Sequence, residues 1–146
     1  MKHKYKNLAP VVLRIGVSLV FLWFGINQLI NPGSFIGYVP QWAYPHGTQV
    51  VHSHSFQFMH VVPKPSVNSL VIINGILETV LGMFLLVGLF IGVTSVILAA
   101  HLLVIALGMG SSEIAVRDFG LSVATFTVFL LDSDKYSLDS MIARKG

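Results

Sequence analysis

Apolar residues form four long runs along the chain, and short polar or glycine-rich segments separate them. The runs cover about residues 8–30, 67–87, 91–108 and 114–132. An α-helix rises about 1.5 Å per residue, so roughly 20 residues cross a hydrocarbon core of about 30 Å. The pattern predicts an all-α fold, an integral membrane four-helix bundle in a single transmembrane domain over residues 1–146. A long extracytoplasmic loop, residues 32–66, is expected between the first and second spans.

The first apolar run follows Lys2, Lys4 and Lys6, and a secretory signal peptide begins in a similar way. The run is longer than the apolar core of such a peptide, contains Arg14 and has no small-residue cleavage site. We therefore expect it to be retained as the first span.

The second run carries a carboxylate, Glu78, near its middle. On a helix, Asn74, Gly75 and Gly82 lie three or four residues from Glu78, so the four residues share one face. This small, polar face is expected to contact protein, because a charged group in contact with lipid is costly. The opposite face is expected to contact lipid in part and contains Ile72, Ile76, Leu77 and Val80.

Depth along the spans brings other polar residues to the level of Glu78. At about 1.5 Å per residue, Glu78 lies roughly 17 Å from the outer start of its span, and His101 lies roughly 15 Å from the inner start of the third. Arg14 enters the first span from the cytoplasmic side and can extend toward Glu78. A carboxylate in lipid is expected to be protonated or to pair with a cation or an imidazole. We predict Glu78 and His101 as catalytic residues, with Arg14 and Asn74 as substrate-binding residues.

Each of these residues also has a purely structural interpretation. Glu78 then ties helices together through a protonated hydrogen bond, His101 is a satisfied interior histidine, and Arg14 extends to lipid headgroups. A functional role is favoured for Glu78, because charged residues inside spans are usually functional. For His101 the depth that it shares with Glu78 supports function as much as structure. The position of Arg14 near the cytoplasmic end favours the structural interpretation for that residue.

Arg117 and Asp118 lie at the start of the fourth run, near the outer mouth of the bundle and under the loop. Adjacent helical residues point about 100° apart, so the two side chains need not pair, and Asp118 is favoured by the helix dipole in any case. Arg117 is a candidate anchor for a quinone carbonyl, for an anionic substrate or for the loop. We include both residues among the predicted binding residues.

The long loop is rich in aromatic residues, prolines and histidines. Prolines prevent one continuous helix, and aromatic residues favour the headgroup region, so we expect one or two short interfacial helices. Imidazoles can bind a metal ion, but the spacing matches no specific site, so we predict no metal site. The weak candidate ligands are His46, His52, His54 and His60.

Composition places the chain in a membrane and excludes several functions. Hydrophobic residues make up 54% of the chain and charged residues only 10%, against about 25% charged in soluble proteins. The net charge of +3 comes from residues near the chain ends and not from a basic stripe, which excludes nucleic acid as a partner. The chain has no cysteine, so it offers no thiolate for disulfide exchange or for zinc or iron–sulfur ligation.

The basic residues also predict the topology. Four spans place both termini and the second link on one side, and this side holds seven of the nine basic residues. The positive-inside rule makes that side cytoplasmic. We expect a multi-pass protein of the cell membrane with both termini in the cytoplasm. The seven residues are Lys2, Lys4, Lys6, Arg14, Lys135, Arg144 and Lys145.

Five segments in order along nearly the whole chain resemble the DoxX/DoxD-like membrane proteins. They are R-I-G-V-S-L-V-F-L-W-F-G-I-N-Q-L-I-N-P from Arg14, G-Y-V-P from Gly37, N-G-I-L-E-T-V-L-G from Asn74, R-D-F-G-L from Arg117, and K-Y-S-L-D ending at Asp139. The resemblance implies a four-helix bundle and a connection to quinone. For function, the resemblance implies a role like that of DoxD, the large subunit of a thiosulfate:quinone oxidoreductase, or like that of relatives that act as partners of redox enzymes or as assembly factors.

Carried over by position, the resemblance singles out Arg14, Asn74, Glu78, Arg117 and Asp118. The chain departs from the family in residues 46–60, which are longer and richer in histidine than the resemblance leads us to expect. This departure puts loop-mediated specificity in doubt.

Our preferred hypothesis is a membrane subunit of a quinone-linked redox system. The bundle receives quinone from the lipid, Glu78 and His101 handle its protons, and electrons come from a partner subunit or a small sulfur-type reductant. The chain needs no intrinsic cofactor in this hypothesis, and its partners are the bilayer and other membrane or redox subunits. The alternative is a non-catalytic accessory or assembly subunit of a larger respiratory or oxidase complex. A transporter or proton channel is less favoured, because no inverted repeat or broken helix is visible.

Overall fold

The computed structural model of the protein describes residues 8–39, 64–131 and 136–144. These residues form helices and no strand, so the predicted all-α class is confirmed. Four helices are long, and they occupy the ranges that the apolar runs predicted. They are α2 (Ala9–Ile30), α3 (Lys64–Val87), α4 (Ile91–Gly108) and α5 (Glu113–Leu130). Two elements are short: the 3₁₀-helix η1 (Pro32–Tyr38), which follows α2, and the C-terminal α6 (Leu138–Ala143).

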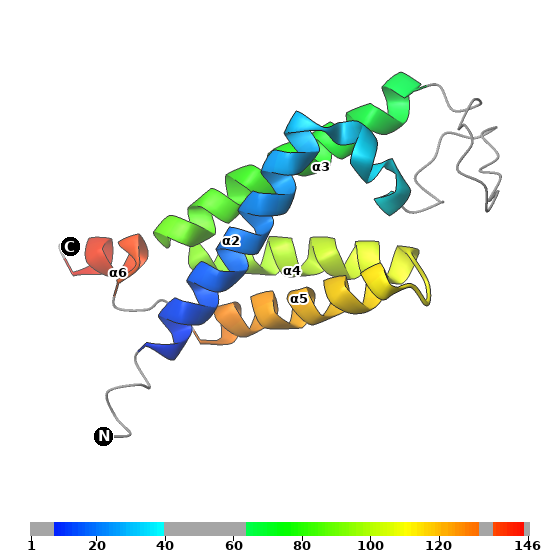
Figure 1. Ribbon diagram of the computed structural model, residues 1–146. Coiled ribbons are helices and arrows are strands. Elements are labelled where there is room, and N and C mark those ends of the chain that lie inside the picture. The colour runs from blue at the N-terminus through cyan, green and yellow to red at the C-terminus, as the bar shows by residue number, and fades with distance from the viewer. Residues whose placement is uncertain (1–7, 40–63, 132–135, 145–146) are drawn as a thin grey trace.

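The four long helices pack as two pairs. α2 lies along α3, α4 lies along α5, and the two pairs cross at an angle (Figure 1). The contacts between the pairs, α2 with α5 and α3 with α4, are less extensive than those within each pair. The buried apolar core lies where the pairs meet, and it is made of Val17, Phe21, Leu85, Ile91, Leu98, Leu102 and Val128.

Glycines bring α2 and α3 close together. A β-carbon placed on Gly25 of α2 would lie 2.8 Å from the backbone nitrogen of Thr79 and 2.9 Å from the carbonyl oxygen of Gly75. Gly75, Glu78 and Gly82 are buried, so the predicted protein-facing side of α3 is confirmed. Ile72, Ile76 and Val80 are exposed, as expected for a lipid-facing side, whereas Leu77 packs against the core.

The turn between α3 and α4 is braced by the C-terminal helix. Gly88 and Phe90 have positive φ angles of 76° and 51° in this turn. The Asp139 carboxylate accepts hydrogen bonds of 2.9 Å from the backbone N–H groups of Phe90 and Ile91, which satisfies the open N-terminus of α4. The backbone N–H of Asp139 donates to the carbonyl of Gly88 at 3.0 Å. Residues far apart in the chain therefore fix one end of the fold.

Within the part of the chain that the structure describes, three helices are long and apolar enough to cross a membrane: α2, α4 and the Val67–Val87 part of α3. This supports a multi-pass membrane protein. α5 has the same length as α4, but its three charged residues, Glu113, Arg117 and Asp118, make it less apolar than the other three helices. The predicted fourth span therefore stays a prediction. The predicted loop, residues 32–66, is described only at its two ends, as η1 and the first turn of α3. The candidate metal ligands His46, His52, His54 and His60 lie outside the described residues.

Candidate functional site

A cavity of about 300 Å³ lies between the two helix pairs and is lined by all four long helices and η1. Its volume is at the lower end of the range for small-molecule sites, about 300–1,000 Å³. Four polar side chains from three helices form one wall: Gln28, Asn74, Glu78 and His101. Aromatic side chains of α2 and η1 contribute elsewhere to the lining: Phe21, Phe24, Phe35 and Tyr38. The cavity therefore combines one polar wall with apolar and aromatic surroundings.

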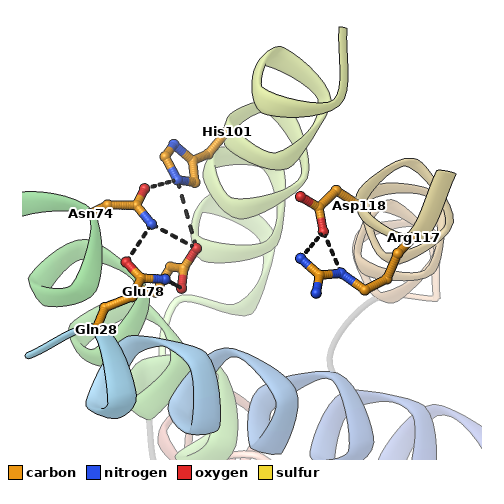
Figure 2. Close-up of polar contacts among 6 residues, drawn as sticks. All are labelled: Gln28, Asn74, Glu78, His101, Arg117 and Asp118. Carbon is orange, nitrogen blue, oxygen red and sulfur yellow. Dashed lines mark hydrogen bonds and ion pairs between the residues drawn. The ribbon is translucent and has the colours of Figure 1, made fainter. Parts of the chain in front are cut away.

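The polar wall is a continuous hydrogen-bonded network (Figure 2). The Asn74 amide nitrogen donates to Gln28 Oε1 at 2.8 Å and to Glu78 Oε1 at 3.0 Å. The Gln28 amide nitrogen donates to the other carboxylate oxygen, Glu78 Oε2, at 2.9 Å. Both oxygens of a carboxylate with only 4% of its residue surface exposed are thus satisfied by amide donors. This matters because a buried polar group without a partner is costly.

The network fixes which ring nitrogen of His101 carries a proton. His101 Nε2 lies 2.6 Å from Asn74 Oδ1 and 4.0 Å from Glu78 Oε1. An amide oxygen can only accept, so Nε2 is the donor in this hydrogen bond. In a neutral imidazole, Nδ1 is then an acceptor, and it points away from Asn74 in Figure 2. His101 can therefore accept a further proton while it keeps its bond to Asn74.

Arg117 and Asp118 form an ion pair that also lines the cavity. Arg117 Nη2 and Nε lie 2.8 and 2.9 Å from Asp118 Oδ1. The guanidinium also lies over the ring of Phe24, at 4.5 Å from the ring centre, and 5.8 Å from that of Tyr38. Helical geometry alone does not require this pair, because neighbouring residues on a helix point about 100° apart. The Arg117 side chain is long enough for its guanidinium to reach the Asp118 carboxylate despite this divergence.

The structure places Arg14 away from the cavity. Its Nη1 donates to the carbonyl of Leu85 at 2.8 Å and also to that of Leu86, at the C-terminal end of α3. The carbonyls of the last helical turn lack partners within the helix, and a cation is favoured there by the helix dipole. The predicted approach of Arg14 to Glu78 is therefore wrong. The Arg14 side chain binds backbone carbonyls at the C-terminal end of α3 and not the Glu78 carboxylate at the middle of that helix.

Sequence reasoning brought Asn74, Glu78 and His101 together, but it missed Gln28 and Phe24. Neither residue was among the predicted site residues. A signal was available: Phe21, Phe24 and Gln28 recur at helical spacing on one side of α2, and a glutamine on an otherwise apolar face requires a buried partner. Among the described residues, no group of three or more His, Asp or Glu side chains is placed to hold a metal ion.

Comparison with known proteins identifies the family. The chain matches the family model described as "TQO small subunit DoxD" over residues 10–146. No curated protein and no solved structure matches the chain. The family's description makes DoxD a small subunit, which corrects the large subunit that the resemblance had implied. The match covers nearly every residue, the five resembling segments included, and so this cavity-containing membrane protein belongs to the DoxD family.

Proposed function

We propose that the protein is a quinone-linked membrane subunit of a redox complex and that its cavity binds the head group of a quinone. The observation that carries this proposal is the polar wall, with Asn74, Glu78 and His101 in one hydrogen-bonded network, inside a cavity whose remaining lining is mostly apolar and aromatic. Asn74 and Glu78 belong to the middle part of a helix that can cross a membrane, at a depth that a lipid-soluble ligand reaches. Membership of a family named for a TQO subunit supports the same conclusion.

The chemistry of quinones fits the groups that line the cavity. A quinone gains two electrons and two protons when it is reduced, so its site needs hydrogen-bonding groups that exchange protons. In our proposal His101 first accepts a further proton at Nδ1 and then transfers that proton to a quinone oxygen, while Nε2 keeps its bond to Asn74. Glu78 is the second acid–base group. Asn74 and Gln28 hold these two residues in position. Electrons come from a partner subunit or a small reductant. Arg117 is less suited to anchor an anion, because Asp118 already balances its charge.

The test is quinone-dependent turnover of the intact complex with altered acid–base residues. Glu78→Gln and His101→Phe are each expected to lower turnover by about 10²-fold or more while the protein stays folded. Ser122→Ala is the matched control, since this buried hydroxyl of α5 bonds the carbonyl of Ala99 and does not line the cavity. Turnover that is unchanged in both Glu78→Gln and His101→Phe would contradict the proposal.

A second candidate function is that of an accessory or assembly subunit, and the outer face of α2 favours it. Val12, Leu19 and Trp23 are more than half exposed on this helix, and a β-carbon on Gly16 would meet nothing within 4 Å. A partner helix could pack there. Gly25, in contrast, is used in the contact with α3 and is not available to a partner. Co-purification of a larger enzyme whose activity is unaffected by Glu78→Gln would favour this function.

A further inference from the structure

The cavity has an apolar mouth between α3 and α4. Leu70 of α3 and Val104 of α4 line the cavity and are also 38% and 53% exposed on the outside of the fold. A residue that belongs both to the lining and to the outer surface marks a place where the cavity opens. α3 and α4 are joined by a short turn but diverge away from it, as Figure 1 shows. The opening therefore lies on the outer surface of the fold, between two helices that are long and apolar enough to cross a membrane.

The apolar mouth and the polar wall are in register along the two helices. Leu70 lies four residues before Asn74 on α3, and Val104 lies three residues after His101 on α4. Because consecutive helices joined by a tight turn run in opposite directions, both steps lead the same way, by about one helical turn. A ligand whose head contacts Asn74 and His101 thus finds an exit toward lipid about one turn farther from the α3–α4 turn.

The other exposed part of the lining does not suit a hydrocarbon chain. It contains Tyr38, which is 37% exposed, and Arg117, whose side chain is 39% exposed. Here the surface carries a guanidinium and a phenol, and a charged group in contact with a hydrocarbon chain is unfavourable. The mouth between Leu70 and Val104 is framed by two aliphatic side chains. The two openings are therefore chemically different, and only one matches the acyl chains of a bilayer.

We propose that quinone enters the cavity sideways from the bilayer, between α3 and α4, and that its long apolar tail stays in the gap between Leu70 and Val104 while its head contacts the polar wall. This inference rests on the proposed quinone-binding function. It adds the route by which quinone enters, and it assigns the head of the quinone to the polar wall and the tail to the mouth between Leu70 and Val104. The site then selects a molecule with a small polar head and a long hydrocarbon tail. A water-soluble head group without a tail has no need of this opening.

The test compares quinones that share a head and differ in the tail. The probes are tailless and long-tailed ubiquinone, and menadione and a long-tailed menaquinone, bound to the intact complex in lipid nanodiscs. Val104→Trp narrows the opening and is expected to slow association of the long-tailed quinones by about tenfold or more, with tailless quinones changed less than about twofold. Ile97→Trp is the matched control, because Ile97 is 44% exposed two turns away on the same side of α4 and does not line the cavity.

A second experiment closes the opening reversibly. The chain contains no cysteine, so Leu70→Cys with Val104→Cys gives one defined pair for a reducible bis-thiosulfonate linker. The linker is expected to block binding of long-tailed quinones and to leave binding of tailless quinones unchanged. Binding of long-tailed quinones should return when the disulfide bonds to the linker are reduced.

Three results would count against these proposals in different ways. Equal loss of long-tailed and tailless binding, or no loss of either, in Val104→Trp and in the linked pair would overturn the lateral route. Selective loss of long-tailed binding in Tyr38→Trp, with Val104→Trp unaffected, would place the tail at the polar mouth and also overturn it. If the unaltered complex binds none of the four quinones, the proposed function itself is wrong.

Discussion

At the scale of single residues, Asn74 is the centre of the polar wall. Its amide group contacts Gln28, Glu78 and His101 together, so its loss leaves each of them with fewer partners. We expect Asn74→Leu to lower the free energy of unfolding by about 1–3 kcal/mol, because buried polar groups lose hydrogen bonds. Quinone-dependent turnover should fall as well, since His101 loses the group that orients it. Denaturant titration in micelles and turnover measure the two effects.

Asn27→Leu is the control for this change, because Asn27 donates only to the carbonyl of Trp23 one turn away on its own helix. It should be nearly neutral in both measurements. A double-mutant cycle of Asn74→Leu with His101→Phe should give a coupling energy of about 0.5–3 kcal/mol. Additive effects would show that the hydrogen bond between the two side chains contributes nothing.

Arg14 is the residue whose role the structure changes most. Its guanidinium binds the last carbonyls of α3, so Arg14→Met should destabilise the protein by about 1–3 kcal/mol through unpaired buried carbonyls. Quinone affinity in the folded fraction should stay unchanged, because Arg14 does not line the cavity. Thermal unfolding and equilibrium quinone binding separate these effects. Weaker quinone binding at unchanged stability would contradict this prediction and would show that Arg14 takes part in quinone binding.

At the scale of elements, the close approach of α2 and α3 depends on Gly25. A β-carbon there would lie 2.5 Å from Thr79 Oγ1 and under 3.0 Å from two backbone atoms of α3. Backbone cannot move aside without separating the helices, so Gly25→Ala should cost about 1–3 kcal/mol in the free energy of unfolding. The separation would also displace Gln28, three residues farther along α2, from Glu78.

Gly16→Ala is the matched control on the same helix, because nothing lies within 4 Å of the added methyl group. Alanine is a better helix former than glycine by up to about 1 kcal/mol, so this variant should be neutral or slightly more stable. Denaturant titrations of the two variants side by side make the comparison. Equal effects of Gly25→Ala and Gly16→Ala would show that helix propensity, and not the α2–α3 contact, decides the outcome.

The elements also show why part of the site could be predicted from the sequence. The apolar runs predicted the long helices because a span in lipid is predominantly apolar over about 20 residues. Helical periodicity gave the buried face of α3, and equal depth brought Glu78 and His101 together. The crossing of the two helix pairs could not be derived in this way. That crossing brings Phe24 of α2 beneath Arg117 of α5. The packing of α2 along α3, which places Gln28 beside Glu78, could not be derived either. A long side chain such as Arg14 can also reach several places from one backbone position.

At the scale of the whole molecule, the two ends of the described chain meet at the turn between α3 and α4. Arg14 Cζ lies 3.3 Å from the position of a β-carbon on Gly88, and Ser137 packs against the same glycine. The start of α2 and the whole of α6 therefore lie at one end of the helix pairs, and the α4–α5 link lies at the other, as Figure 1 shows. If α4 crosses the membrane, α5 must return across it to connect the link with α6.

The charges of α5 are compatible with such a return. Ser112 caps its first turn, where Glu113 is favoured by the helix dipole, and Asp118 is buried and paired with Arg117. With this return the predicted number of crossings is four, and the basic residues Arg14 and Arg144 lie at the same end as the α3–α4 turn. By the positive-inside rule we predict that this end is cytoplasmic.

This topology predicts the side from which two single cysteines react. Ser111→Cys in the exposed α4–α5 link should be labelled by a membrane-impermeant maleimide in intact cells. Met141→Cys in α6, where Met141 is 50% exposed, should react only after the membrane is opened. The chain has no other cysteine, so the unaltered protein gives the background. Labelling of both sites in intact cells would mean that α5 does not cross, and the reverse pattern would mean that the termini face outward. Either result would change the position assigned to the cavity mouth between α3 and α4 relative to the two faces of the bilayer.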